Sequence, residues 1–242
     1  MTMQTKELYY PTLYKGELFE DGYKGCRIFV LGHQAPATDG EEDTFMNNRD
    51  EFVRDYKRNN VELVKDDILE EGYKNWKKKG DGRRTNTWRK FINIILYPNK
   101  PSLDSAEAKD LLRRIAFANY LTKPCFNKNR IGTDDLAFYT NDLEAFKHYI
   151  NEAFTNTDKP NIVIAWGASA YPHIQNYANN GDDTHCVLKN EKGAVVNIIK
   201  IKHPMVANQQ DTHIAIESCI EALKKNKKTA IFKYVTGKKD VE

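Results

Sequence analysis

The chain has 242 residues, of which 40% are hydrophobic and 29% charged, and its net charge is +3. This composition excludes a disordered chain and fits one globular domain with a full core. We expect a single domain over 1–242, with its core at 26–225, a lead-in over 1–25 and a lysine-rich tail over 226–242. The apolar runs are too short to cross a bilayer and the first residues lack a signal-peptide core, so we expect a cytoplasmic protein with no membrane partner.

The cysteine and histidine patterns argue against a metal site or cofactor. The four cysteines are widely spread, without a C-x-x-C pair, and the six histidines are scattered, without an H-E-x-x-H motif. The chain also lacks a P-loop and a G-x-G-x-x-G fingerprint, which leaves nucleotide hydrolysis and dinucleotide binding unsupported. We therefore expect no metal and no cofactor.

Buried strands alternate with helices along the chain. Short apolar runs predict strands over 27–31, 115–121 and 161–166, and residues 185–188 and 195–201 flank a turn and predict a hairpin. Helical spacing predicts helices over 44–58, 66–78, from Thr87 to the prolines at 98 and 101, 105–113, from Asn141 to 154, after Gly167, and 211–225. This alternation predicts an α/β protein with a mainly parallel sheet.

Three of these strands run into polar loops, and in an open parallel sheet ligands sit beyond the carboxyl ends of the strands. The first loop spans 32–36, where Gly32 permits close backbone approach and Pro36 stiffens the chain. Asn119 ends the second strand; its carboxamide matches the N3–H and O4 of uracil or thymine, or it caps the strand end. His203, fixed by Pro204, is placed to donate to an oxygen that becomes anionic, or it binds nearby backbone.

A basic segment over 74–90 contains a single acid, Asp81. Its two glycines predict a loop, and such a loop suits a phosphate backbone or is merely a solvated surface. The residues in its middle that we expect to contact DNA are Lys77, Lys78, Lys79, Arg83 and Arg84.

In their order along the chain, these segments resemble the uracil-DNA glycosylase superfamily, of which the chain is identified as a divergent member. The resemblance rests on the first loop, on Ala116-Phe117-Ala118-Asn119, on the strand Ile-Val-Ile-Ala-Trp-Gly, and on His203-Pro204-Met205. It implies a three-layer α/β/α sandwich around a central, mainly parallel four-stranded sheet. It also implies an N-glycosidic bond hydrolase of DNA repair that flips a base out of DNA.

The resemblance assigns roles to individual residues. Asn119 would read the base and His203 would stabilise the departing anion, with Phe45 stacking on the base. Gly32, His33 and Pro36 would line the base and sugar, and Gln34 would orient the water. Met205 or Val206 would wedge into the helix where the base left, to offset the cost of unstacking.

The chain departs from the family pattern in the first loop, where many members carry an acid or asparagine that positions the water. Gln34 cannot act as a base, although Asp39, Glu41 and Glu42 follow closely. A binding protein without turnover on the same fold is therefore the alternative, and a serine hydrolase using Ser169 is a third hypothesis. We expect DNA, single- or double-stranded, as the partner and a monomer as the assembly.

Overall fold

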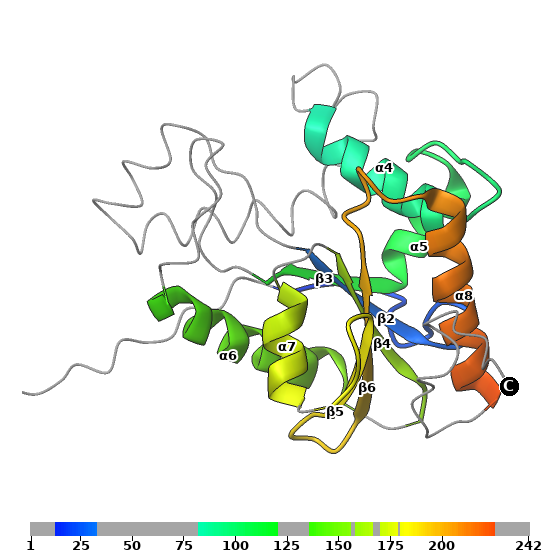
Figure 1. Ribbon diagram of the computed structural model, residues 1–242. Helices are drawn as coiled ribbons and strands as arrows, with labels where there is room; N and C mark the ends of the chain where they lie inside the picture. Colours follow the sequence, from blue (N-terminus) through cyan, green and yellow to red (C-terminus); the bar gives the residue numbers. More distant parts are fainter. Residues whose placement is uncertain are drawn as a thin grey trace, which may run out of the picture.

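The computed structural model describes residues 13–32, 82–120, 136–155, 158–166, 170–178 and 180–225. Within them lies one six-stranded sheet with the order β1-β3-β2-β4-β6-β5 (Figure 1). The strands are β1 (Tyr14–Lys15), β2 (Arg27–Gly32), β3 (Ile115–Asn119), β4 (Asn161–Trp166), β5 (His185–Lys189) and β6 (Val195–Ile201). The four central strands run parallel, and β1 and β5 pair antiparallel at the two edges.

The prediction of a mainly parallel α/β sheet is confirmed, but its expected size of four strands is wrong. The four parallel strands are those that the sequence indicates, and β5 and β6 form the predicted hairpin. The count of four, which the resemblance implied, leaves out both edge strands, although the sequence predicts β5 as part of the hairpin. Strand β1 has only two residues, too few for an alternating pattern, and it lies in the expected lead-in, where Leu13, Tyr14 and Phe19 are buried.

Strands β2, β3 and β4 consist mostly of apolar residues because both faces of the sheet are covered. All six residues of β2 and of β4 are buried. Successive side chains point to opposite faces. Ile28 and Val30 therefore enter one hydrophobic cluster, and Phe29 and Leu31 enter the other.

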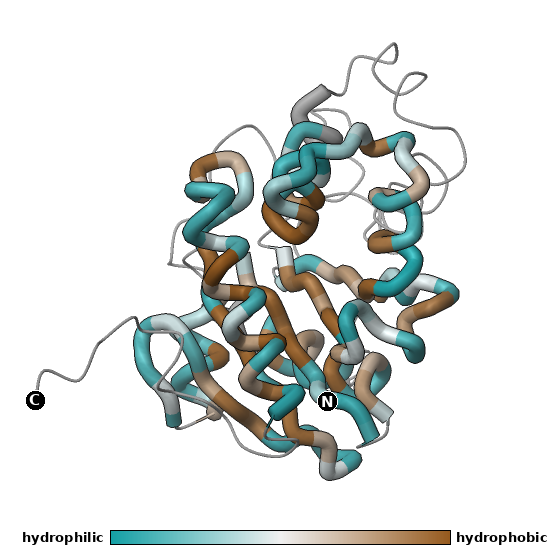
Figure 2. Tube along the Cα trace, turned by 90° about the vertical axis from the view of Figure 1, so that its right-hand side faces the viewer, coloured by the Kyte–Doolittle hydropathy of each residue, from teal (hydrophilic) through white to brown (hydrophobic). Residues whose placement is uncertain are grey.

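The helices divide between these two clusters. The first cluster contains side chains of α4 (Gly82–Ile95), α5 (Ala106–Arg113) and α8 (Gln209–Lys225), and the second those of α6 (Leu136–Ala153) and α7 (Ala170–Ala178). Figure 1 shows α6 and α7 on one side of the sheet and the other three on the opposite side. The hydrophobic stretches of the chain gather in the strands and on the inner sides of the helices (Figure 2).

Helix boundaries match the predictions better at some ends than at others. Ser105 caps α5, and its side chain accepts from the N–H of Ala108. Helix α4 begins at Gly82 rather than Thr87, and α6 at Leu136 rather than Asn141, because these helices extend beyond the residues that signal a cap. The expected helices over 44–58 and 66–78 lie outside the described residues. Among the helices that are described, no segment has the length and apolar character that a bilayer crossing needs.

Candidate functional site at the carboxyl edge of the sheet

The four parallel strands end at the same edge of the sheet, and their last residues form one row. Gly32 pairs with Asn119, and Trp166 pairs with Ile201. Leu31 pairs with Ala165, so Gly32 and Trp166 are the next residues of their strands. Neighbours in such a row point to the same face. Asn119, Gly32 and Trp166 therefore face α4, α5 and α8 together.

Gly32 leaves room for the carboxamide of Asn119. A Cβ at position 32 would collide with Oδ1 of Asn119, and would stand 3.0 Å from Nε1 of Trp166 and 3.1 Å from Cε2 of Phe117. Asn119 is buried, at 7% exposed. Glycine is needed here because it leaves space for these side chains, and the amide oxygen and the indole nitrogen both lie beside it.

An aromatic cluster packs beside Gly32 and Asn119, on the face of the sheet that α4 covers. The ring of Trp166 lies 5.5 Å from Trp88 and 5.1 Å from Phe91 between centroids, both at steep angles. Phe117 lies 4.9 Å from Trp88 and 5.8 Å from Trp166. Because all four side chains are at most 5% exposed, the cluster is a rigid floor beneath the row of strand ends.

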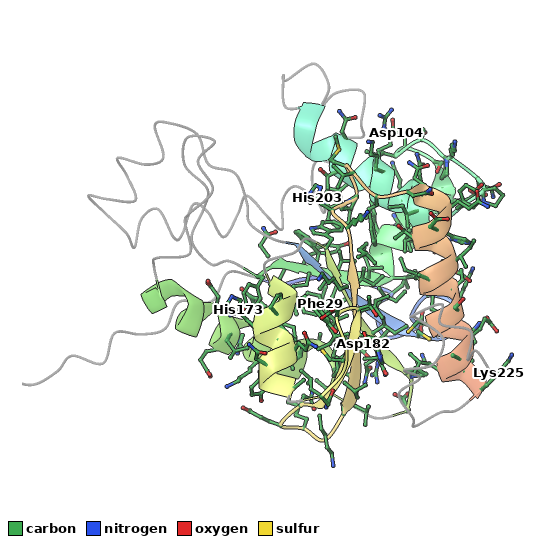
Figure 3. The ribbon with its side chains drawn as sticks, viewed as in Figure 1. Phe29, Asp104, His173, Asp182, His203 and Lys225 are labelled. Atoms are coloured by element: carbon green, nitrogen blue, oxygen red, sulfur yellow. The ribbon has the colours of Figure 1, made fainter. Side chains whose placement is uncertain are left out.

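His203 follows β6 and lies over Trp166. Their ring centroids are 6.1 Å apart, and Figure 3 shows His203 on the segment that rises from β6 beside α4. The N–H of Met205 donates to Nδ1 of His203 at 3.3 Å. The neutral ring then carries its proton on Nε2, which makes Nε2 the donor.

The turn after His203 is tightly bonded although its tip is apolar and exposed. The carbonyl of His203 accepts from the N–H groups of Val206, at 2.9 Å, and Ala207, at 3.1 Å. Nζ of Lys90 on α4 donates to the carbonyl of Met205 at 2.9 Å. Met205 is 39% exposed and Val206 73%. The turn therefore presents two apolar side chains to solvent from a fixed backbone.

The structure thus places Gly32 and Asn119 side by side at the carboxyl edge. Trp166 lies next to Gly32 and packs against His203, and Met205 lies in the turn after His203. The structure does not test the rest of the predicted site. The following residues lie outside the described part: His33, Gln34, Pro36, Phe45, Lys77, Lys78, Lys79 and Ser169. Arg83 and Arg84 lie in the first turn of α4, and only their backbone is described.

Three buried cysteines offer no reactive thiol. Burial raises the pKa of Cys26 and of Cys186 to about 11, and that of Cys219 to about 12. A thiol with so high a pKa is a poor nucleophile at neutral pH. Among the residues that the structure describes, no cluster of His, Cys, Asp and Glu is arranged to hold a metal ion.

Sequence reasoning missed Trp166 and Lys90 as parts of this site. The apolar run 161–166 predicts Trp166 only as the end of a strand, and the sequence presents Lys90 only as one of many basic residues. The signal for Trp166 was its place as the last residue of a parallel strand, equivalent to Gly32 and Asn119. No sequence signal pairs Lys90 with the carbonyl of Met205, because that bond depends on how α4 packs.

Comparisons with known proteins leave the site without a family name. No protein-family model matches the chain, and no curated protein matches it in sequence. The chemistry of the site therefore has to follow from the way Gly32, Asn119, Trp166 and His203 meet at the carboxyl edge.

Proposed function

We propose that this chain is a DNA glycosylase, a divergent member of the uracil-DNA glycosylase superfamily with its three-layer α/β/α sandwich. It flips uracil or a related base out of DNA and hydrolyses the N-glycosidic bond. The observation that carries the proposal is the meeting of a buried carboxamide, Asn119, and a histidine donor, His203, at one edge of a parallel sheet. Both adjoin the indole of Trp166.

Asn119 recognises the base in this proposal. Its Oδ1 accepts from N3–H of uracil, and its amide donates to O4. The burial of Asn119 supports this role. A base that leaves a buried carboxamide without hydrogen-bond partners binds less favourably than one that satisfies it. Its position at the end of a strand, over Gly32, fixes the direction in which the carboxamide is presented.

His203 stabilises the leaving group. Breaking the N-glycosidic bond leaves negative charge on the base, and a preorganised donor at O2 lowers that barrier. The bond from the Met205 N–H to Nδ1 supports this role, since it holds the Nε2–H tautomer and the ring orientation before substrate arrives.

The remaining parts of the proposal come from the sequence. Gln34 orients the attacking water, with His33 and Pro36 against the sugar and Phe45 stacked on the base. The basic residues at 77–79, 83 and 84 neutralise backbone phosphates, which makes binding salt-dependent. Met205, exposed on its bonded turn, enters the space that the flipped base leaves.

The test is cleavage of a labelled oligonucleotide that carries one uracil, single- and double-stranded, followed by alkali to break abasic sites. We expect a cut strand with the unaltered chain, and a loss of about 100-fold or more in rate with Asn119→Ala and with His203→Ala. His148→Ala is the matched control, since His148 is half exposed on α6. If both site variants keep full activity while folded, the proposed site is wrong.

The first loop favours a second candidate, a binding protein that recognises the same base without turnover. Residues 33–36, His-Gln-Ala-Pro, contain no carboxylate to activate water. This candidate predicts a salt-dependent gel shift of the uracil oligonucleotide that Asn119→Ala weakens, with no abasic product from any strand form. An abasic product excludes it.

A further inference from the structure

We propose that the indole N–H of Trp166 is a third hydrogen-bonding group of the ligand site, and that it decides which base edge the site accepts. It donates to O4 of the base beside Asn119. This inference rests on the proposed function and adds a specificity-determining residue to it.

The indole is held firmly in place. Trp166 is 4% exposed and is the last residue of β4, in the centre of the sheet. Rings of Trp88, Phe91, Phe117 and His203 surround it, with centroids between 5.1 and 6.1 Å away. A side chain packed on so many sides has one orientation, so its N–H points in a fixed direction.

The indole nitrogen lies next to Gly32, as does the carboxamide of Asn119. Nε1 stands 3.0 Å from the point where a Cβ on Gly32 would lie, and Oδ1 of Asn119 stands closer still to the same point. Among the residues that the structure describes, no hydrogen bond joins this N–H to an acceptor, and the ring packs against the four rings named above. The N–H of a largely buried indole usually has a partner. A ligand that occupies the strand ends supplies one.

A fixed donor solves a problem that an asparagine cannot solve alone. A carboxamide turned by 180° exchanges its oxygen and nitrogen, so it can serve uracil in one orientation and cytosine in the other. Uracil presents O4, an acceptor, where cytosine presents an amino group, a donor. An indole has only a donor. With Trp166 beside it, the pair accepts a carbonyl and meets the amino group of cytosine donor to donor.

The first experiment replaces Trp166 with Phe, which keeps a ring and removes the N–H. Cleavage of the uracil oligonucleotide is measured as kcat/KM, and binding of 2′-deoxyuridine and 2′-deoxycytidine is measured by titration. We expect Trp166→Phe to lower kcat/KM for uracil 10- to 100-fold, and to reduce the preference for 2′-deoxyuridine at least tenfold. Trp88→Phe measures what lost packing alone costs, because it removes an indole that packs against Trp166 in the same cluster; the effect of Trp166→Phe must exceed it. Circular dichroism and thermal melts show whether each variant is folded.

The second experiment reads the N–H directly in the unaltered chain. The three tryptophans give three indole signals in a ¹H–¹⁵N spectrum, which the two Phe variants help to assign. We expect the Trp166 signal to shift when 2′-deoxyuridine is added and to stay in place with 2′-deoxycytidine. This measurement does not depend on catalysis or on the stability of a variant.

The outcomes separate this inference from the proposed function. If the chain cleaves uracil DNA but folded Trp166→Phe keeps its kcat/KM and the Trp166 signal does not move, the inference falls and the function stands. If no strand is cut but the Trp166 signal moves with 2′-deoxyuridine alone, the glycosylase proposal falls. The inference that the Trp166 N–H donates to O4 of the base then stands. If no strand is cut and no signal moves, both fall.

Discussion

Asn119 lies opposite Gly32 in the parallel register of β3 and β2, and its Oδ1 occupies the space that a side chain at position 32 would need. The two residues are therefore one structural unit. Glycine is required here because of its neighbour. The carboxamide of Asn119 in turn lies against Gly32, next to which the indole of Trp166 also lies.

The first prediction is that Gly32→Ala damages the site more than the fold. The new methyl group would push against Oδ1 of Asn119 and Nε1 of Trp166, both of them side-chain atoms held by rigid surroundings. We expect stability to fall by about 1–3 kcal/mol in urea unfolding. We also expect uracil cleavage to fall by about 100-fold or more, since a shift near 1 Å in a site group has such effects. Activity near that of the unaltered chain would show that Asn119 does not need its present position.

The sequence predicted the parallel strands well because their physical signal is local. Strands β2 and β4 are covered on both faces, so they read as short unbroken apolar runs between polar loops. The polar residues at the ends of β3 and β6 also stand out: Asn119 follows the apolar run 115–118, and His203 follows Ile201 with only Lys202 between them. The rule that parallel strands share one carboxyl edge then brings the two residues together.

The features that the sequence does not predict depend on packing between distant segments. The two-residue strand β1 exists only because β3 offers it backbone partners. The role of Trp166 depends on Asn119, which lies on the other side of β2. In an apolar run, a tryptophan more often belongs to the core than to a ligand site. In the sequence, Lys90 is one of many basic residues. Its hydrogen bond to the carbonyl of Met205 depends on how α4 packs.

A second prediction concerns that bond between Lys90 and the turn. Lys90→Met keeps the aliphatic stem and removes the donor; of the turn's hydrogen bonds to described residues, those with His203 then stay. Because a hydrogen bond of this kind contributes about 0.5–1.5 kcal/mol, we expect hydrogen exchange at Val206 and Ala207 to accelerate about two- to tenfold. KM for uracil DNA should rise by a similar factor, with kcat nearly unchanged. Lys109→Met on α5 is the control; equal effects of the two variants would contradict a role for this bond.

A third prediction separates stability from function at the opposite edge of the sheet. Arg27 is fully buried, and its Nε donates to Oδ1 of Asn161 at 2.9 Å. Asn161→Ala leaves part of this buried charge unsatisfied, so we expect a loss of about 2–4 kcal/mol in urea unfolding. Uracil cleavage per folded molecule should be unchanged, since Arg27 and Asn161 begin the strands that Gly32 and Trp166 end. Asp158→Ala removes an exposed partner of Arg27 and should cost less than about 1 kcal/mol.

The last prediction is a loss of stability in mild acid that originates at His185. This residue is 1% exposed in β5, and burial lowers its pKa below the ordinary value of 6.5, although nearby Asp182 opposes the shift. The unfolded chain then binds a proton at a higher pH than the folded chain does. Stability is therefore retained above pH 6.5 and falls as the pH decreases toward the folded pKa, by at most about 1.4 kcal/mol per pH unit for one proton.

Urea unfolding of the unaltered chain and of His185→Gln between pH 8 and pH 5 measures this contribution. We expect the variant to be less stable at pH 8, because glutamine fits the buried position less well, and to lose less stability as the pH falls. Parallel curves for the unaltered chain and His185→Gln would place the acid sensitivity elsewhere in the molecule.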